Sequence, residues 1–326
     1  MRIVAAPDKF KGTASAADVA AAIGRAANAA GVECAEVPLA DGGEGTLDVL
    51  GGSNRVSTVT GPLGHPVDAA WRLDRTGAVI EMAQAAGLTL AGGPEANDPL
   101  VATTRGVGEL ILEAVEAGAP EIIVGVGGSA TTDGGLGAVE VIGSSARLRG
   151  TRIIVACDVR TRFLEAARVF GPQKGATRAQ VSFLSRRLHQ LAERYEDEFG
   201  VAVGGLDRSG AAGGLAGGLA ALGAELVDGF EVIAERVNLP DQLVGADLVV
   251  TGEGFLDRES FSGKVVGGVA GLARSADVPV LAIAGQVFDG ADGHIDAVSL
   301  TERFGLERAL TDPVGCVFEV VESLVP

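Results

Sequence analysis

The chain has 326 residues and a formal net charge of −17, and 47% of its residues are hydrophobic. This length predicts two domains of ordinary size. The negative charge argues against nucleic acid and acidic membrane surfaces as partners. No apolar run reaches the roughly 20 residues that span a membrane. Three distant cysteines and a first strand without a signal peptide's apolar region predict a cytoplasmic protein, which we expect to be a monomer or homodimer.

The first 50 residues have the pattern of a strand–helix–strand unit. An apolar run at 3–6 predicts a strand, and Ser15 is a suitable N-cap for an alanine-rich helix that ends near Gly31. A second strand is expected at 33–38. The glycines of "LADGGEGT" at 39–46 then open a short helix.

The middle of the chain changes style after residue 54. Three short runs joined by the turn sequences "GPLGHP" and "DRTG" predict an antiparallel meander. Helices and strands then alternate, and the Gly/Ala-rich stretch "GAAGGLAGGLAALGA" predicts a helix that packs very close to a neighbour. The expected elements are strands at 56–60, 67–73, 78–82, 121–126 and 152–157, and helices at 106–118, 178–199 and 210–224.

Two further strands are expected near the C-terminus, at 247–251 and 278–284, with a helix from Lys264 to about Ala276 between them. Parallel units at both ends of the chain and a meander between them predict an α/β protein of two domains. A discontinuous domain of residues 1–54 and 203–326 would hold a Rossmann-like parallel sheet. Residues 55–202 would form an inserted mixed α/β domain, with a ligand cleft between the two.

Polar residues and glycines follow four of the expected strands. They are Asp8, Lys9 and Lys11 in "APDKFKG", Asp41 and Glu44 in "LADGGEGT", Gly127, Gly128, Ser129, Thr131, Thr132 and Asp133 in "GVGGSATTDGG", and Gly252, Glu253 and Gly254 in "TGEG". Phosphoryl transfer to a hydroxyl needs amides and cations for the phosphates, carboxylates for Mg²⁺ and a carboxylate that accepts the hydroxyl proton. The set meets these needs, although the chain has no Walker loop.

These motifs, taken together, resemble those of the bacterial glycerate kinases that form 2-phosphoglycerate. The resemblance also includes "TGPLG", "IEMAQAAGL", "TTRGVGELI", "VACDV", "VFGPQKGA" and "DLVVTGEGFLDRESFSGK", in the order of the family. It implies ATP-dependent and Mg²⁺-dependent phosphorylation of D-glycerate. It also implies a flavodoxin-like domain and an insertion that resembles the restriction-endonuclease fold.

The resulting hypothesis assigns roles to the strand-end residues and leaves several alternatives open. The ATP phosphates lie over the glycine amides at 125–135 or 252–254, with Lys174 or Lys264 neutralising their charge. Lys9 or Lys11 anchors the substrate carboxylate, and Asp8 or Asp41 accepts the hydroxyl proton. The Mg²⁺ ligands come from Asp41, Glu44, Asp158 and Glu253.

Two other classes of function compete with this hypothesis. A Rossmann-type oxidoreductase is disfavoured, because "APDKFKG" lacks the glycines of a dinucleotide turn. A non-catalytic or substrate-shifted paralogue that binds a sugar acid or nucleotide is the alternative. It is favoured by "RTRFLEAAR" at 160–168, which is shorter than the family's segment and lacks its proline and glycine.

Overall fold

The computed structural model describes residues 1–261, 263–288 and 295–325. Contacts divide the chain into two compact units. Unit 1 comprises Met1–Asp41 and Phe230–Pro326, and unit 2 comprises Gly42–Gly229. The first unit is therefore built from both ends of the chain, and the second from the residues between them. None of the helices in the described part is both long and apolar enough to cross a lipid bilayer.

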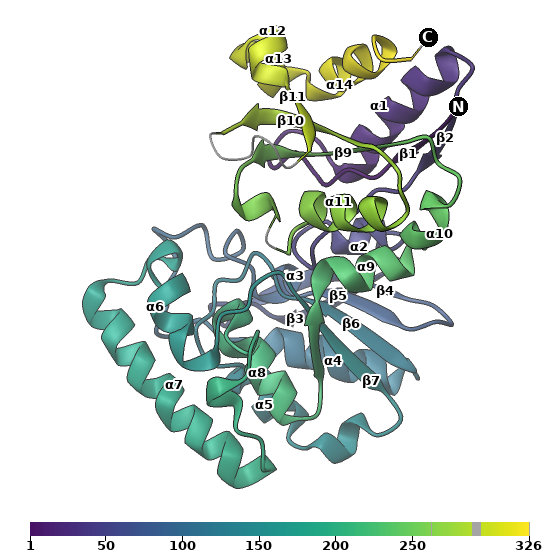
Figure 1. Ribbon diagram of the computed structural model, residues 1–326. Coiled ribbons are helices and arrows are strands. Elements are labelled where there is room, and N and C mark those ends of the chain that lie inside the picture. Colours follow the sequence, from purple (N-terminus) through teal and green to yellow (C-terminus); the bar gives the residue numbers. More distant parts are fainter. Residues whose placement is uncertain (262, 289–294, 326) are drawn as a thin grey trace. The chain divides into compact units, whose positions relative to one another are not determined.

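Unit 1 contains a parallel sheet of five strands in the order β11-β10-β9-β1-β2 (Figure 1). N-terminal and C-terminal strands share this sheet, which confirms the expected Rossmann-like arrangement. Its last strand, β11, was not expected from the sequence. The strands are β1 (Arg2–Ala5), β2 (Glu33–Glu36), β9 (Leu248–Leu256), β10 (Val280–Val287) and β11 (Asp296–Ser299).

Helices cover both faces of this sheet. Ile283 of β10 packs in one core with α1 and α14, whereas the adjacent Ala282 and Ala284 pack in another with Val266 of α11. This alternation is expected of a strand that is buried on both faces. The helices of unit 1 are α1 (Ala16–Ala29), α9 (Gly229–Arg236), α10 (Leu239–Leu243), α11 (Val265–Ser275), α12 (Leu300–Phe304), α13 (Leu306–Thr311) and α14 (Pro313–Glu322).

Unit 2 contains a mixed sheet of six strands in the order β3-β4-β5-β6-β7-β8. The first three strands form the expected antiparallel meander, and β5 to β8 run parallel. The strands are β3 (Arg55–Thr60), β4 (Pro66–Leu73), β5 (Ala78–Glu81), β6 (Glu121–Gly125), β7 (Arg152–Cys157) and β8 (Glu225–Asp228).

One face of the mixed sheet packs on a single large core. Ile122 and Val124 of β6 and Val155 of β7 contribute to it, together with apolar residues of α4, α5, α7 and α8. Figure 1 shows α7 as the longest helix of this unit. The helices are α2 (Thr46–Val49), α3 (Ala83–Ala86), α4 (Arg105–Glu116), α5 (Leu136–Ile142), α6 (Ala166–Phe170), α7 (Arg178–Phe199) and α8 (Leu215–Ala221).

Two expectations about elements are wrong. The stretch 210–224 is not one helix, because Ala212, Gly213 and Gly214 have positive φ angles and break it before α8. A Cβ at Gly213 would lie 2.0 Å from the Thr131 carbonyl oxygen, so the expected close packing is present in another form. The strand expected to end at Thr251 continues to Leu256, since it pairs with β10 along that length.

The compact units differ from the expected domains in residues 42–54 and 203–229, which unit 2 contains. Part of this difference comes from β8, which pairs with β7 and so belongs to the mixed sheet. The α2 segment is likewise held in unit 2, because the Leu47 amide donates to Glu81 Oε1 at 2.8 Å. The domain boundaries at 54/55 and 202/203 stay a prediction, since contacts do not measure independent folding.

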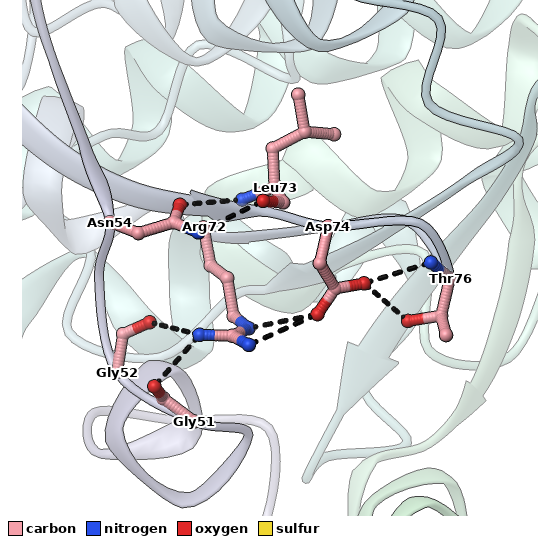
Figure 2. A network of polar contacts seen from close by, with 7 residues as sticks. All are labelled: Gly51, Gly52, Asn54, Arg72, Leu73, Asp74 and Thr76. Atoms are coloured by element: carbon pink, nitrogen blue, oxygen red, sulfur yellow. Dashed lines mark hydrogen bonds and ion pairs between the residues drawn. The ribbon is translucent and has the colours of Figure 1, made fainter.

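A polar network fastens the turn between β4 and β5 (Figure 2). Arg72 Nη1 donates to the carbonyl oxygens of Gly51 and Gly52 at 2.8 and 3.2 Å, and Arg72 Nε donates to Asp74 at 3.1 Å. Hydrogen bonds from Thr76 hold the pKa of Asp74 below its ordinary value. The network lies where β5 begins, at the opposite end of the strand from Glu81, so we interpret it as structural.

Candidate functional site

In unit 1, the predicted residues Asp8, Asp41 and Glu253 come together beyond or near the ends of neighbouring strands. Asp8 follows β1, and its amide donates to the Gly252 carbonyl oxygen of β9 at 2.8 Å. Asp41 follows β2, and it is close enough for its negative charge to raise the pKa of Asp8. The charge of Asp8 in turn raises the pKa of Glu253. The parallel sheet therefore gathers three carboxylates that lie far apart in the sequence.

Asp8 is buried, and its side chain is 12% exposed. Burial raises its pKa to about 6, Lys9 opposes this rise and Asp41 adds to it. Lys9 contacts the carboxyl through its backbone amide, at 2.7 Å from Oδ1, and through its ammonium group at 3.8 Å. Asp8 is thus ionised at neutral pH and takes up a proton only slightly below it.

Glu253 lies inside β9 rather than beyond its end, so its side chain is fixed by a paired strand. Burial raises its pKa to about 7, a hydrogen bond from Ser260 opposes the rise, and Asp8 adds to it. Its Oε1 atom is buried and has no hydrogen-bond partner among the described residues. An unpaired buried carboxylate oxygen is costly unless a ligand or ion completes it.

The segment after β9 supplies a cation and a buried hydroxyl. Lys264 is the N-cap residue of α11, and its Nζ atom lies 4.0 Å from Glu259 Oε2. Its positive charge lowers the pKa of both Asp8 and Glu253. The buried Ser260 hydroxyl accepts from the Asp257 amide at 3.0 Å. The cluster "TGEGFLDRESFSGK" therefore surrounds Glu253 in unit 1, apart from Ser262, which lies outside the described residues.

The remaining predicted residues of unit 1 play a smaller part. Lys11 is exposed. Gly254 lets the chain after β1 lie close to β9, because a Cβ there would be 3.3 Å from the Lys11 amide nitrogen. A Cβ at Gly252 would lie 2.1 Å from the Ile283 carbonyl oxygen. Both glycines belong to a central strand, so we explain them by close backbone packing.

In unit 2, the predicted residues Lys174, Ser129 and Thr131 form one buried group. Lys174 is 2% exposed, and its Nζ donates to Ser129 Oγ and to the Thr131 carbonyl oxygen, both at 2.7 Å. Burial lowers the pKa of Lys174 to about 7, and the charge of Asp133 partly offsets this. A buried ammonium group held only by neutral acceptors is a suitable contact for an incoming anion.

Asn97, which lies beside this group, was missed by the sequence analysis. Asn97 donates through Nδ2 to the carbonyl oxygens of Ala130 and Lys174, at 3.0 and 2.9 Å, while its Oδ1 atom has no partner among the described residues. Thr132 Oγ1 is also buried without a partner there. Asn97 lies in "PEAND", a stretch with no recognisable motif, so no pattern pointed to it.

The glycine loop after β6 packs against the loop before α2. A Cβ at Gly127 would lie 2.5 Å from Gly43 Cα, and Gly128 has a φ of 71°. Glu81 at the end of β5 fastens the same α2 loop through the Leu47 amide. Two motifs that are far apart in the sequence are therefore adjacent in unit 2, and Glu44 belongs to one of them.

Asp133 is a structural anchor of this loop. Its Oδ2 atom accepts from the Thr104 amide, the Thr104 hydroxyl and the Gly137 amide, at 2.8 to 3.2 Å, and its Oδ1 atom accepts from the Gly135 amide at 3.1 Å. Tyr195 of α7 donates to the Gly134 carbonyl oxygen at 3.0 Å. These contacts occupy both carboxylate oxygens and fasten the loop to the start of α5, so we interpret Asp133 as structural, and its role in cofactor binding stays a prediction.

Asp158 follows β7, as expected. Burial raises the pKa of the Cys157 thiol, and the negative charge of Asp158 adds to this rise. The sequence analysis missed the neighbouring ion pair of Arg208 and Asp228, whose atoms Nη2 and Oδ2 are 2.9 Å apart. Arg208 precedes the glycine-rich stretch and Asp228 ends an unexpected strand, so neither stood at an expected strand end. With these residues, β5 to β8 all carry polar side chains at the same edge.

The predicted metal ligands do not form a closed cage. Asp41 and Glu253 belong to unit 1 and Glu44 to unit 2. Within the described parts of the chain, no group of three or more His, Cys, Asp or Glu side chains could hold a metal ion by itself. Mg²⁺ in phosphoryl-transfer enzymes is usually bound by one or two carboxylates and the substrate phosphates, so a complete protein cage is not required.

Comparisons with known proteins identify relatives over nearly the whole chain. The family model described as "Glycerate kinase family" matches residues 3–146 and 140–313. The chain is 41% identical to glycerate 2-kinase of Escherichia coli K12, covering 89% of this chain and 86% of that protein. It is 39% identical to glycerate kinase of Bacillus subtilis 168, covering 88% and 85%. The crystal structure of a protein assigned as glycerate kinase 2 from Salmonella typhimurium LT2 has a TM-score of 0.84 at 36% identity, covering 99% and 98% of the two chains.

Proposed function

Because the chain belongs to the glycerate kinase family, we propose that it transfers the γ-phosphoryl group of ATP to the 2-hydroxyl of D-glycerate. The product is 2-phosphoglycerate, and the reaction depends on Mg²⁺. The class of enzyme is a glycerate kinase, a phosphotransferase with an alcohol group as acceptor. The nucleotide, the metal and the position of the new phosphate are the parts that we propose.

The observation that best supports this chemistry is a pair of carboxyl groups in unit 1, buried Asp8 and half-buried Glu253. Asp8 and Glu253 have pKa values raised to about 6 and about 7, mainly by burial, and each lies within the electrostatic reach of Lys264. A general base works best when its pKa is near the operating pH. We assign Asp8 as the acceptor of the 2-hydroxyl proton, with Lys9 beside it to keep it ionised.

The buried lysine of unit 2 supports the binding of phosphate. Lys174 and Ser129 offer a cation and a hydroxyl close together, beside the glycine loop at 126–135. A bound phosphate would place a negative charge beside the Lys174 ammonium group and would raise the pKa of Lys174 again. We therefore assign the nucleotide phosphates to this loop rather than to Gly252–Gly254 in β9.

The residues of unit 1 fit Mg²⁺. Carboxylate oxygen is the ligand type that this ion prefers, and Glu253 Oε1 is buried without a partner among the described residues. We assign Glu253 and Asp41 as its protein ligands. When bound, the ion neutralises negative charge on the β- and γ-phosphates.

The experiment is an ADP-release assay with D-glycerate, L-glycerate and related hydroxy acids, with the product identified by phosphorus NMR. Turnover with D-glycerate and a 2-phosphate product is the expected result. Asp8→Asn should lower kcat about 10²- to 10⁴-fold while calorimetry still detects glycerate binding. Asp18→Asn, the same change in the capping box of α1, is the matched control and should leave kcat unchanged.

Two results would contradict the proposal. If the protein binds ATP and glycerate but releases no ADP, it is the non-catalytic paralogue that the sequence left open. If Asp8→Asn keeps the wild-type kcat, another group accepts the proton.

A further inference from the structure

An arginine bridges the carboxyl ends of β7 and β8 in unit 2. Cys157 and Asp228 are the paired last residues of these strands. Arg208 Nη1 donates to the Cys157 carbonyl oxygen at 3.1 Å, and Nη2 donates to Asp228 Oδ2 at 2.9 Å. The carboxyl edge of a parallel sheet is where α/β proteins bind ligands. The charged pair therefore stands at a position suited to binding, beside Asp158.

Arg208 adopts an unusual backbone conformation. Its φ angle is 71°, in the left-handed region that residues other than glycine rarely occupy. Such residues persist only where surrounding contacts fix them, and they are concentrated at functional sites. Here the fixing contacts include the two side-chain hydrogen bonds and a backbone hydrogen bond from the Arg208 amide to the Arg160 carbonyl oxygen, at 3.4 Å.

The ion pair is incomplete as it stands. The side chains of Arg208 and Asp228 are only 14% and 11% exposed. Asp228 Oδ1 is buried and accepts no hydrogen bond from the described residues. The guanidinium has more N–H groups than its two bonds use. A small molecule that offers both a hydrogen-bond donor and an anionic acceptor would satisfy this pair.

The segment 160–168 lies directly against the stretch that carries Arg208. The Gly210 amide donates to the Thr161 carbonyl oxygen at 3.0 Å, and the Phe163 amide donates to Ser209 Oγ at 2.9 Å. These hydrogen bonds fasten the segment to the residues that directly follow the arginine.

We propose that Arg208 and Asp228 form a binding subsite for a small hydroxy acid. The guanidinium binds the carboxylate, and Asp228 Oδ1 accepts a hydrogen bond from a hydroxyl that is not phosphorylated, which in glycerate is the 3-hydroxyl. The proposal rests on the proposed function for the identity of the ligand. It replaces Lys9 or Lys11 as the anchor of the substrate carboxylate.

The first test is Arg208→Gln, with kinetics for both substrates. The KM for D-glycerate should rise about 10- to 100-fold, while the KM for ATP stays within about twofold. Arg152→Gln is the matched control, because Arg152 Nε pairs with Glu225 at 2.9 Å between the same two strands at their other end. The control should leave both KM values unchanged.

A second test addresses the hydroxyl. D-lactate lacks the 3-hydroxyl, so the wild type should bind D-glycerate more tightly than this competitor. Asp228→Asn should reduce that preference about tenfold. If Arg208→Gln does not fold, Arg208→Lys keeps the charge but loses the forked geometry, and it should still raise the glycerate KM.

A different result is expected if the Arg208–Asp228 pair only stabilises the fold. Loss of thermal stability with unchanged glycerate KM in folded Arg208→Gln or Arg208→Lys would overturn the subsite. Calorimetric titration of glycerate without nucleotide separates this inference from the proposed function. Weaker binding in the Arg208 variant supports the subsite even if the wild type transfers no phosphate, and equal binding overturns it even if the wild type is an active kinase.

Discussion

Replacing Lys174 by methionine should separate stability from activity. Methionine has a similar length and no charge, so it removes the buried ammonium group without opening a large cavity. The pKa of Lys174 is lowered from 10.5 to about 7, mainly by burial. At about 1.4 kcal/mol per pKa unit, keeping Lys174 charged in the folded protein lowers the free energy of unfolding by roughly 5 kcal/mol. The loss of hydrogen bonds to Ser129 and Thr131 costs about 1 to 3 kcal/mol in the opposite direction.

The net expectation is that ligand-free Lys174→Met is about 2 to 4 kcal/mol more stable than the wild type at pH 7. The sign follows from proton binding. Between pH 7 and 10.5 the unfolded chain binds more protons at Lys174 than the folded chain, so the stability of the wild type rises with pH across this range. The advantage of the variant should therefore disappear near pH 10.

Urea unfolding at several pH values measures the stability, and the ADP-release assay measures the activity. We expect kcat/KM to fall at least about 10²-fold in the variant, because the phosphate loses its buried cation. Ser129→Ala removes one partner of the lysine and keeps the charge, so it should lower kcat/KM less than Lys174→Met does. A variant that is less stable than the wild type at pH 7, or one that keeps full activity, would refute this reasoning.

Three other substitutions test separate parts of the site. Because burial raises the pKa of Glu253 to about 7, kcat/KM of the wild type should fall below about pH 7 as this carboxyl takes up a proton, and Glu253→Gln should be nearly inactive at every pH in the same assay. Gly252→Ala should lower the free energy of unfolding by about 2 kcal/mol, because its Cβ would lie 2.1 Å from the Ile283 carbonyl oxygen; urea unfolding with unchanged stability would contradict this. Asp133→Asn should lower the free energy of unfolding by about 2 kcal/mol, since its side-chain amide group would face the Thr104 and Gly137 backbone amides. This variant should reduce kcat less than Lys174→Met does.

The periodic features of the fold could be predicted from the sequence. Ser15 caps α1 as expected, with Asp18 completing the capping box, and the meander follows from its turn sequences. Conversely, β8 has a half-exposed and polar-flanked sequence, so its strand conformation depends on pairing with β7. The break at Ala212 also depends on tertiary contact, because the chain there must pass close to Thr131.

The candidate site was predictable where a polar residue directly follows a strong strand. Asp8 and Asp158 were found in this way, and "GPQKG" indicated Lys174 as a loop cation. The sequence did not indicate that Lys174 is buried, since its position depends on segments near residues 94–97 and 129–132. Asn97 and Arg208 were missed for the same reason, because their hydrogen-bond partners are distant in sequence.

The inserted arrangement has a consequence for how the chain acquires its structure during synthesis. Thr251 Oγ1 donates to the Ala6 carbonyl oxygen across 245 residues of sequence, and β1 pairs directly with β9. β1 must therefore wait for β9, whereas every strand of unit 2 has been synthesised by residue 229. At ribosomal speeds, residues 230–256, which complete β9, take roughly 1 to 5 seconds to add. Until β9 is made, one edge of β1 has no neighbouring strand, so a late segment of the chain determines when this edge becomes protected from aggregation.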